Sequence, residues 1–285
     1  MQRLFPFVIA AALAAAGFGL AGPRREPVKT PTPAAEITFE QLIAMPVPAN
    51  ERYYVIVFGS QSSPKLPRFT HTWVAGVRAT WNDGQTEPAL ETHTISWMPA
   101  TLHIRTFSRH VEPGVNLNMY DSIKIMQSKG ERVSMWGPYE LRSHVFTRFL
   151  VQKAFMESGA VGYQCIDRGG EAGRCGTGCD CIHAVTDMDP EFSRERYPLR
   201  LNGNDASRNI VEQLARRGTL PQGVREQEWL RSRLGLDCAG IERQCYNGPV
   251  NDMINPRYLP YLFPQAGMSS RATSQSSGSA ALATK

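Results

Sequence analysis

The stretch HTWVAGVRAT, His71 to Thr80, followed by ETHTISW, Glu91 to Trp97, has the pattern of two paired β-strands. Both runs are rich in β-branched and aromatic residues, and Asn82-Asp83-Gly84 between them contains Asp-Gly, a strong hairpin signal. The run YYVIVF, Tyr53 to Phe58, is short and apolar, as expected for a buried strand. These three runs predict a β-sheet in the first half of the chain.

The rest of the folded part adds two short strands and a series of helices. The strands are expected at 103–107 and 132–136. Apolar residues at helical spacing predict the helices. Their expected ranges are 119–128, 140–158, 182–187, 209–217 and 227–234. Strands followed by helices, rather than a strict alternation of the two, predict an α+β fold.

Both ends of the chain differ from the middle. Residues 1–21 carry one early charge, Arg3, followed by an apolar run. They end with the small residues Gly19 and Ala21 at the −3 and −1 positions of a cleavage site. This pattern predicts a secretory signal peptide, with an uncleaved membrane anchor as the alternative. Residues 22–36 are rich in Pro, Arg and Thr and predict a flexible linker, and residues 265–285 predict a disordered tail. No other segment is long and apolar enough to span a membrane.

The composition is typical of a globular protein, and the predicted signal peptide would export it to the periplasm or the extracellular space. Hydrophobic residues make up 42% of the chain, enough for a packed core. The net charge is +5, and the basic residues are spread along the chain rather than gathered into clusters with interleaved aromatic residues. Nucleic-acid binding is therefore not expected.

The six cysteines allow up to three disulfides in an oxidising compartment. Cys238 and Cys245 are close in sequence and isolated from the others, so they are the expected pair. A bridge from Cys181 to Cys165 or Cys175 would instead make Cys181 structural. A zinc cluster is a further alternative. Its ligands would be Cys175, Cys179, Cys181 and His183. Because the compartment favours disulfides, no metal or cofactor is expected.

Cys181 is the candidate nucleophile. It follows the glycine-rich stretch 169–178 at a predicted helix start, where the exposed N–H groups lower the pKa of a thiol, although a negative charge on Asp180 raises it. Such a nucleophile needs a histidine base, which in turn needs an orienting partner. His183 is only two residues from Cys181 and would point to a different side of the helix. His71 and His93, one on each strand of the predicted hairpin, are the better candidates.

The segment Ala154 to Val185 resembles a known family. It reads Ala-x4-Gly-x-Val-x-Tyr, then a loop, then Asp-Cys-x-His-x-Val. This order is similar to the cysteine segment of circularly permuted NlpC-type proteins, nearest the lecithin retinol acyltransferase-like branch, where a Val-x-Tyr strand precedes an Asn-Cys-x-His-Phe-Val helix. Here Asp180 replaces the family's Asn and Ala184 its Phe, and the loop from Cys165 to Cys179 is an insertion.

The resemblance implies a papain-like fold in permuted order, with an antiparallel sheet and helices packed on it in residues 37–190. The helices predicted after this core make residues 191–264 a helical extension packed on it. It implies Cys181 as the nucleophile and His71 as the base. The orienting polar residue would lie on the strand 91–97, where His93 is our choice and Glu91 is the alternative. The Cys181 N–H would hold the oxyanion.

The function implied by the resemblance is that of a cysteine hydrolase or acyltransferase, such as a thiol protease, which attacks amide or ester bonds and passes through a thioester. Its substrate would be a peptide, a lipid or another component of the cell envelope. The alternative is a catalytically inactive relative on the same fold, serving as an extracytoplasmic binding protein or an envelope-associated structural protein.

Overall fold

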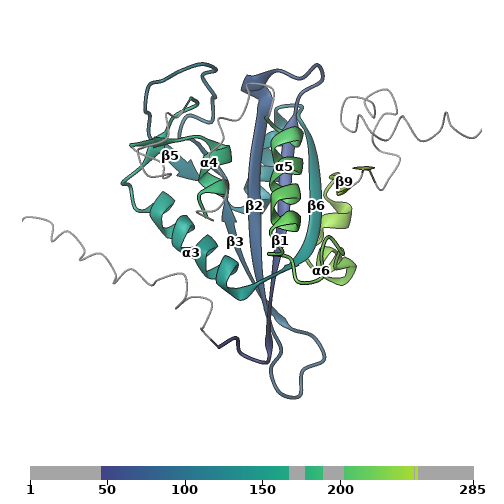
Figure 1. Ribbon diagram of the computed structural model, residues 1–285. Helices are drawn as coiled ribbons and strands as arrows, with labels where there is room; N and C mark the ends of the chain where they lie inside the picture. The colour runs from purple at the N-terminus through teal and green to yellow at the C-terminus, as the bar shows by residue number, and fades with distance from the viewer. Residues whose placement is uncertain (1–45, 167–176, 189–201, 247, 250–285) are drawn as a thin grey trace, which may run out of the picture. The chain divides into compact units, whose positions relative to one another are not determined.

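The computed structural model describes residues 46–166, 177–188, 202–246 and 248–249. All described residues belong to one compact unit, Phe39–Lys285. The predicted signal peptide, linker and tail lie outside the described residues. The described part is an α+β fold, as predicted, with a six-stranded sheet and helices on both of its faces (Figure 1).

The main sheet has the strand order β10-β9-β6-β1-β2-β3. Its strands are β1 (Glu51–Gln61), β2 (Thr70–Thr80), β3 (Ala89–Ile95), β6 (Arg132–Leu141), β9 (Glu242–Cys245) and β10 (Gly248–Pro249). β1 runs antiparallel to both β2 and β6. β9 pairs with β6 in parallel, so the sheet is mixed rather than wholly antiparallel as predicted. Between β6 and β9 the described part of the chain forms four α-helices, and such a crossover lets a strand enter in the direction of its neighbour.

β2 and β3 form the predicted hairpin. The expected turn is present, because the Gln85 N–H donates to the Asn82 carbonyl at 3.0 Å and Gly84 has the left-handed φ of 78°. β3 ends at Ile95, opposite Val74, so residues 70–73 of β2 have no partner in β3. The chain then continues into two shorter pairs. These are β4 (Trp97–Pro99) with β5 (Gly114–Asn116), and β7 (Gly162–Tyr163) with β8 (Gly178–Cys179).

Helices cover both faces of the sheet, so β1 is buried continuously from Tyr54 to its end. The helices are α2 (Met119–Ser128), α3 (Ser143–Glu157), α4 (Cys181–Thr186), α5 (Asn204–Arg216) and α6 (Glu228–Arg233), with 3-10 turns at Pro67–Phe69 and Leu236–Cys238. On one face, a Cβ added at Gly59 would lie 2.6 Å from Asn204 of α5, and one added at Gly76 would lie 2.8 Å from Phe149 of α3. α2 and α6 pack on the other face, where the Tyr54 ring meets a tryptophan of α6. A strand that is buried on both faces has apolar residues at successive positions rather than alternating ones, and YYVIVF in β1 has this pattern.

Most of the predicted elements are confirmed. The runs 53–58, 71–80 and 132–136 lie within β1, β2 and β6, and 119–128 is α2. The expected helix 140–158 starts only at Ser143, because the residues before it continue β6. The strand predicted at 103–107 is wrong. That segment is part of the loop between β4 and β5, where Leu102 and Phe107 have φ of 57° and 65°, which an extended strand does not allow.

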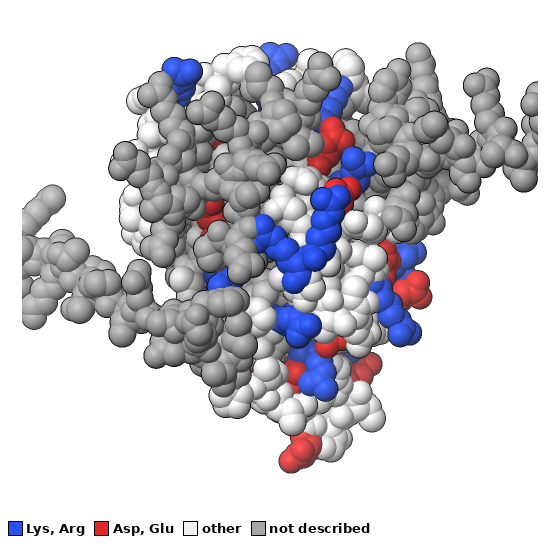
Figure 2. Space-filling view, viewed as in Figure 1, with Lys and Arg blue, Asp and Glu red and all other residues white. Residues whose placement is uncertain are grey.

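Residues 202–246 and 248–249 belong to the same sheet assembly. α5 packs on β1 and β2, and β9 extends the sheet beyond β6. On the face that carries α5, basic side chains lie among acidic ones (Figure 2). Glu212 of α5, for example, lies 3.7 Å from Arg208 and 3.6 Å from Arg216. Among the described residues, no helix is long and apolar enough to cross a membrane.

Candidate active site

Cys181 is the first residue of α4, directly after β8. Asp180 caps this helix, since its carboxylate accepts hydrogen bonds at 2.8 Å from the N–H groups of Ile182 and His183. The same carboxylate contacts His183 Nδ1 at 2.9 Å. His183 is therefore held by Asp180 at the helix start.

The oxidation state of the cysteines leaves Cys181 available for chemistry. Cys181 and Cys165 are both free thiols, so Cys181 is not bridged to Cys165 or to Cys175. Cys179 is disulfide-bonded, which removes it as a thiolate ligand of the alternative zinc cluster. Cys238 is also a free thiol, so the predicted bridge between Cys238 and Cys245 is wrong. Cys238 lies exposed in a 3-10 turn and Cys245 ends β9, so nearness in sequence does not bring the two sulfurs together.

The thiol lies at the uncovered end of β2. The main-chain N–H of Thr72 is hydrogen-bonded to the Cys181 sulfur, at a position that β3 no longer covers. The nitrogen of Thr72 is joined to the carbonyl carbon of His71, so the thiol contacts the main chain next to the residue that carries the imidazole. Among the described residues, no hydrogen bond joins the Cys181 sulfur to a ring nitrogen of His71, because Nδ1 has no partner and Nε2 contacts Ser96. The structure therefore brings the predicted nucleophile and the predicted base to one end of the sheet.

His71 is fully buried, and a chain of hydrogen bonds fixes its ring. Nε2 lies 2.9 Å from Ser96 Oγ, and Ser96 Oγ lies 2.8 Å from Ser122 Oγ of α2. Ser122 Oγ also donates to the Asn118 carbonyl at 2.7 Å. His71 Nδ1 is buried and has no hydrogen-bond partner among the described residues.

This chain assigns the tautomer of His71. A carbonyl can only accept, so the single hydroxyl proton of Ser122 is directed to Asn118. Ser96 then donates its own proton to Ser122, and its remaining role toward the imidazole is to accept from Nε2–H. The proton of the neutral ring is therefore on Nε2, and Nδ1 carries a lone pair able to accept a proton.

Both groups are neutral at rest. Burial raises the pKa of the Cys181 thiol far above its ordinary value, the Asp180 carboxylate raises it further, and the hydrogen bond from Thr72 lowers it in part. The expected effect of Asp180 is thus confirmed. Burial also lowers the pKa of His71 to about 3, with a contribution from the nearby Lys129 ammonium. At neutral pH the site holds a thiol and a neutral imidazole rather than an ion pair.

His93 does not reach His71. It lies opposite Gly76, five residues along β2 from His71, which corresponds to about 16 Å of strand. Its Nε2 contacts Glu91 at 2.8 Å, and Glu91 also pairs with Arg78. Neither of the two orienting residues considered from the sequence therefore contacts the base. That contact is made by Ser96, which lies on the predicted segment 91–97 but beyond the point where β3 leaves β2.

The resting state of Cys181 can be tested by alkylation. We expect iodoacetamide at pH 7 to modify Cys181 more than tenfold more slowly than Cys238, because the thiolate is the reactive form and each unit of pKa lowers its fraction about tenfold. Cys238 is exposed and serves as the internal reference. Peptide mapping by mass spectrometry at several times and pH values measures both rates. Equal rates at pH 6 would contradict the neutral resting state of Cys181.

The comparisons with known proteins give no further guidance. No protein-family model matches the chain, and neither the curated proteins nor the solved structures that were searched contain a match.

Proposed function

We propose that this protein is an exported cysteine hydrolase or acyltransferase with a permuted papain-like arrangement, acting on amide or ester bonds through a thioester. The single observation that carries the proposal is the placement of Cys181, a free thiol, on the main chain next to His71, whose buried Nδ1 has no partner among the described residues. A buried nitrogen acceptor left without a hydrogen bond costs stability, and a catalytic role is one explanation for such a group. The proposed substrates are peptides, lipids or other components of the cell envelope.

The proposed reaction begins with proton transfer. As the Cys181 sulfur attacks the substrate carbonyl carbon, its proton passes to His71 Nδ1, because neither group is charged beforehand. The carbonyl oxygen becomes an oxyanion near the Cys181 N–H. The C–N or C–O bond then breaks, the leaving group takes the proton from Nδ1, and an acyl thioester remains. Water or an amine attacks this thioester, again giving its proton to Nδ1, and the thiol is regenerated.

Ser96 has a positioning role in this scheme. By accepting from Nε2–H, it holds the ring in the tautomer that keeps Nδ1 unprotonated. A hydroxyl in this place stabilises the imidazolium less than a carboxylate would, because it carries no negative charge. The site therefore favours a short-lived imidazolium during attack over a stable ion pair at rest.

Export is part of the proposal. The disulfide at Cys179 supports an oxidising compartment, where such bonds persist. The predicted signal peptide agrees with this location, although residues 1–21 lie outside the described residues.

The alternative function is an inactive relative that binds a partner outside the cytoplasm. The raised pKa of Cys181 favours this alternative, since an activated nucleophile usually has a lowered one. The two functions differ in one respect that can be measured, namely whether Cys181 forms a covalent acyl adduct.

Acylation of Cys181 tests the proposed function. We expect 4-nitrophenyl acetate to release 4-nitrophenol and to leave an acetyl group on Cys181, detected as an added mass on the peptide that contains it. Cys181→Ala should abolish the reaction. Cys165→Ala is the matched control, because Cys165 is a neighbouring free thiol whose pKa is also raised by burial. Loss of the reaction in Cys165→Ala alone, or no adduct on Cys181, would favour the inactive alternative.

A further inference from the structure

The loop between β4 and β5, residues 100–113, lies beside both members of the site. Near its start, the Leu102 carbonyl accepts a hydrogen bond at 2.6 Å from Lys129, the residue whose charge acts on His71. In its middle, the Phe107 N–H is hydrogen-bonded to the Cys165 thiol, which interacts electrostatically with Cys181. One loop thus extends from the base to the nucleophile.

The far end of the loop is also anchored close to the thiol. Glu112 and Tyr163 exchange two main-chain hydrogen bonds, of 2.9 and 2.7 Å, and Tyr163 of β7 is paired with Cys179 of β8, two residues before Cys181. The Ile166 N–H donates to the Ser108 carbonyl at 3.2 Å. These bonds fix the main chain of the loop, so that its outward side chains have defined positions beside the site.

Phe107 is the main outward apolar group of this loop. Its side chain is 63% exposed, and its main chain has the left-handed φ of 65°, which is costly for a residue with a side chain. Most of this side chain is exposed to water, so it contributes little to the core. A fixed main chain that holds an aromatic ring in solvent beside a reactive thiol has the properties of a substrate contact.

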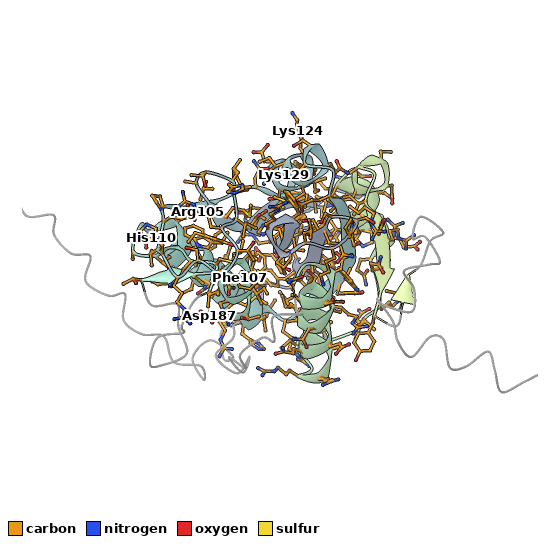
Figure 3. All side chains as sticks on the ribbon, turned by 90° about the horizontal axis from the view of Figure 1, so that it is seen from above. Arg105, Phe107, His110, Lys124, Lys129 and Asp187 are labelled. Atoms are coloured by element: carbon orange, nitrogen blue, oxygen red, sulfur yellow. The ribbon has the colours of Figure 1, made fainter. Side chains whose placement is uncertain are left out.

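Basic side chains lie near Phe107. In the view from above, Arg105 and His110 lie to one side of Phe107, Asp187 at the end of α4 lies to its other side, and Lys129 lies farther away (Figure 3). Arg105 and Arg109 are exposed, and neither forms an ion pair with any residue in the described part of the chain. This contrasts with α5, where the arginines lie beside Glu212.

We propose that the 100–113 loop binds the substrate of the Cys181 site, with Phe107 contacting an apolar group and Arg105 and Arg109 contacting an anionic group of the same molecule. The substrate class is then an amide or ester that combines an acyl chain or aromatic side chain with a carboxylate or a phosphate. Guanidinium groups bind either anion through paired hydrogen bonds. This inference rests on the proposed function, because it names the substrate class of that same site.

Binding to a variant without the thiol separates this inference from the proposed chemistry. We expect full-length Cys181→Ala protein at low salt to bind octanoate or octyl phosphate at least tenfold more tightly than octanamide, as measured by ligand-observed NMR. Comparison of the two anions distinguishes a carboxylate site from a phosphate site. Arg105→Gln combined with Arg109→Gln should reduce anion binding to the level of octanamide. Arg216→Gln with Arg225→Gln removes the same charge from exposed positions elsewhere and should leave the preference intact.

Variants of Phe107 test the aromatic contact separately. Phe107→Ala should weaken binding of all three ligands about tenfold, and Phe107→Tyr, which keeps the ring, should restore it. Two results would overturn the anion site. One is that octanamide binds as tightly as octanoate and octyl phosphate, and the other is that the two double-arginine variants lose the same amount of anion binding. If the preference holds but 4-nitrophenyl acetate never acylates Cys181, the loop is a binding site and the proposed catalysis is wrong.

Discussion

Replacing His71 with glutamine should lower the rate at which 4-nitrophenyl acetate acylates Cys181 by about 10²–10⁴-fold at pH 7, the range typical of a general base. The thiol is neutral at rest because burial and Asp180 raise its pKa, so attack requires an acceptor for its proton. The Nδ1 lone pair of His71 is that acceptor, and the glutamine side chain offers no comparably basic atom. Stopped-flow measurement of 4-nitrophenol release gives the rate.

Two companion variants make this result specific. Ser96→Ala removes the contact at 2.9 Å from Nε2, and we expect a smaller loss with a changed pH profile, because the tautomer of His71 is no longer fixed. His93→Gln applies the same replacement at a histidine that lies opposite Gly76, and the rate should not change. An unchanged rate in His71→Gln with a melting temperature equal to that of the parent would show that His71 is not the base. A loss in His93→Gln equal to that in His71→Gln would contradict the observed strand register.

The sequence was sufficient to predict the elements whose signals are local. β1 and β2 are runs of β-branched and aromatic residues, and α2 has its apolar residues at helical spacing, so residue type and period determine them. The segment 103–107 has similar composition, but its backbone is decided by tertiary contacts, including the hydrogen bond from Phe107 to Cys165. The parallel pairing of β9 is another non-local feature, since it depends on how the chain returns across the sheet.

The candidate site shows the same limit at the level of single residues. Cys181 and His71 were predicted from a helix start, a strand and a family resemblance, and the structure places the thiol on the main-chain N–H of Thr72, the residue after His71. The partner of His71 depends on register, which the eight-residue connection 81–88 does not reveal. Val74 opposite Ile95 puts Ser96 diagonally across from His71 and leaves His93 several residues away. The alternation of Thr92, Thr94 and Ser96 along the strand is the signal that could have pointed to Ser96.

Unfolding at acidic pH should reveal the buried, neutral state of His71. Its pKa is lowered to about 3 in the folded protein, against about 6.5 for an unfolded chain, so between these values the unfolded state binds a proton that the folded state does not. The free energy of unfolding therefore falls as the pH falls below 6.5, by about 1.4 kcal/mol per pH unit, and the contribution of His71 lost by pH 4 is about 3 kcal/mol.

Comparison with His71→Asn isolates this contribution, because asparagine does not titrate. Burial raises the pKa of Glu131 and Glu242, which acts in the opposite direction, since these folded-state carboxyls take up protons more readily as the pH falls. Both carboxyls are present in parent and variant, so their effect cancels in the difference. Urea unfolding at pH 7, 6, 5 and 4 measures the free energy of unfolding of the parent and of His71→Asn. As the pH falls, the parent should lose stability more steeply than the variant, by the equivalent of about one bound proton. His110→Asn, at an exposed histidine, should keep the dependence of the parent.

Equal slopes for the parent and His71→Asn would mean that the folded protein protonates His71 as easily as the unfolded chain does. In that case the imidazole would be solvated and able to form an ion pair with Cys181 at rest. A steeper slope in the parent would mean that the fold keeps the His71 imidazole neutral and loses stability at acidic pH as a result. A role of Nδ1 as a base would explain why the fold accepts this loss. The measurement thus links stability to mechanism, because the burial that makes His71 hard to protonate at rest also makes it return its proton readily to a leaving group.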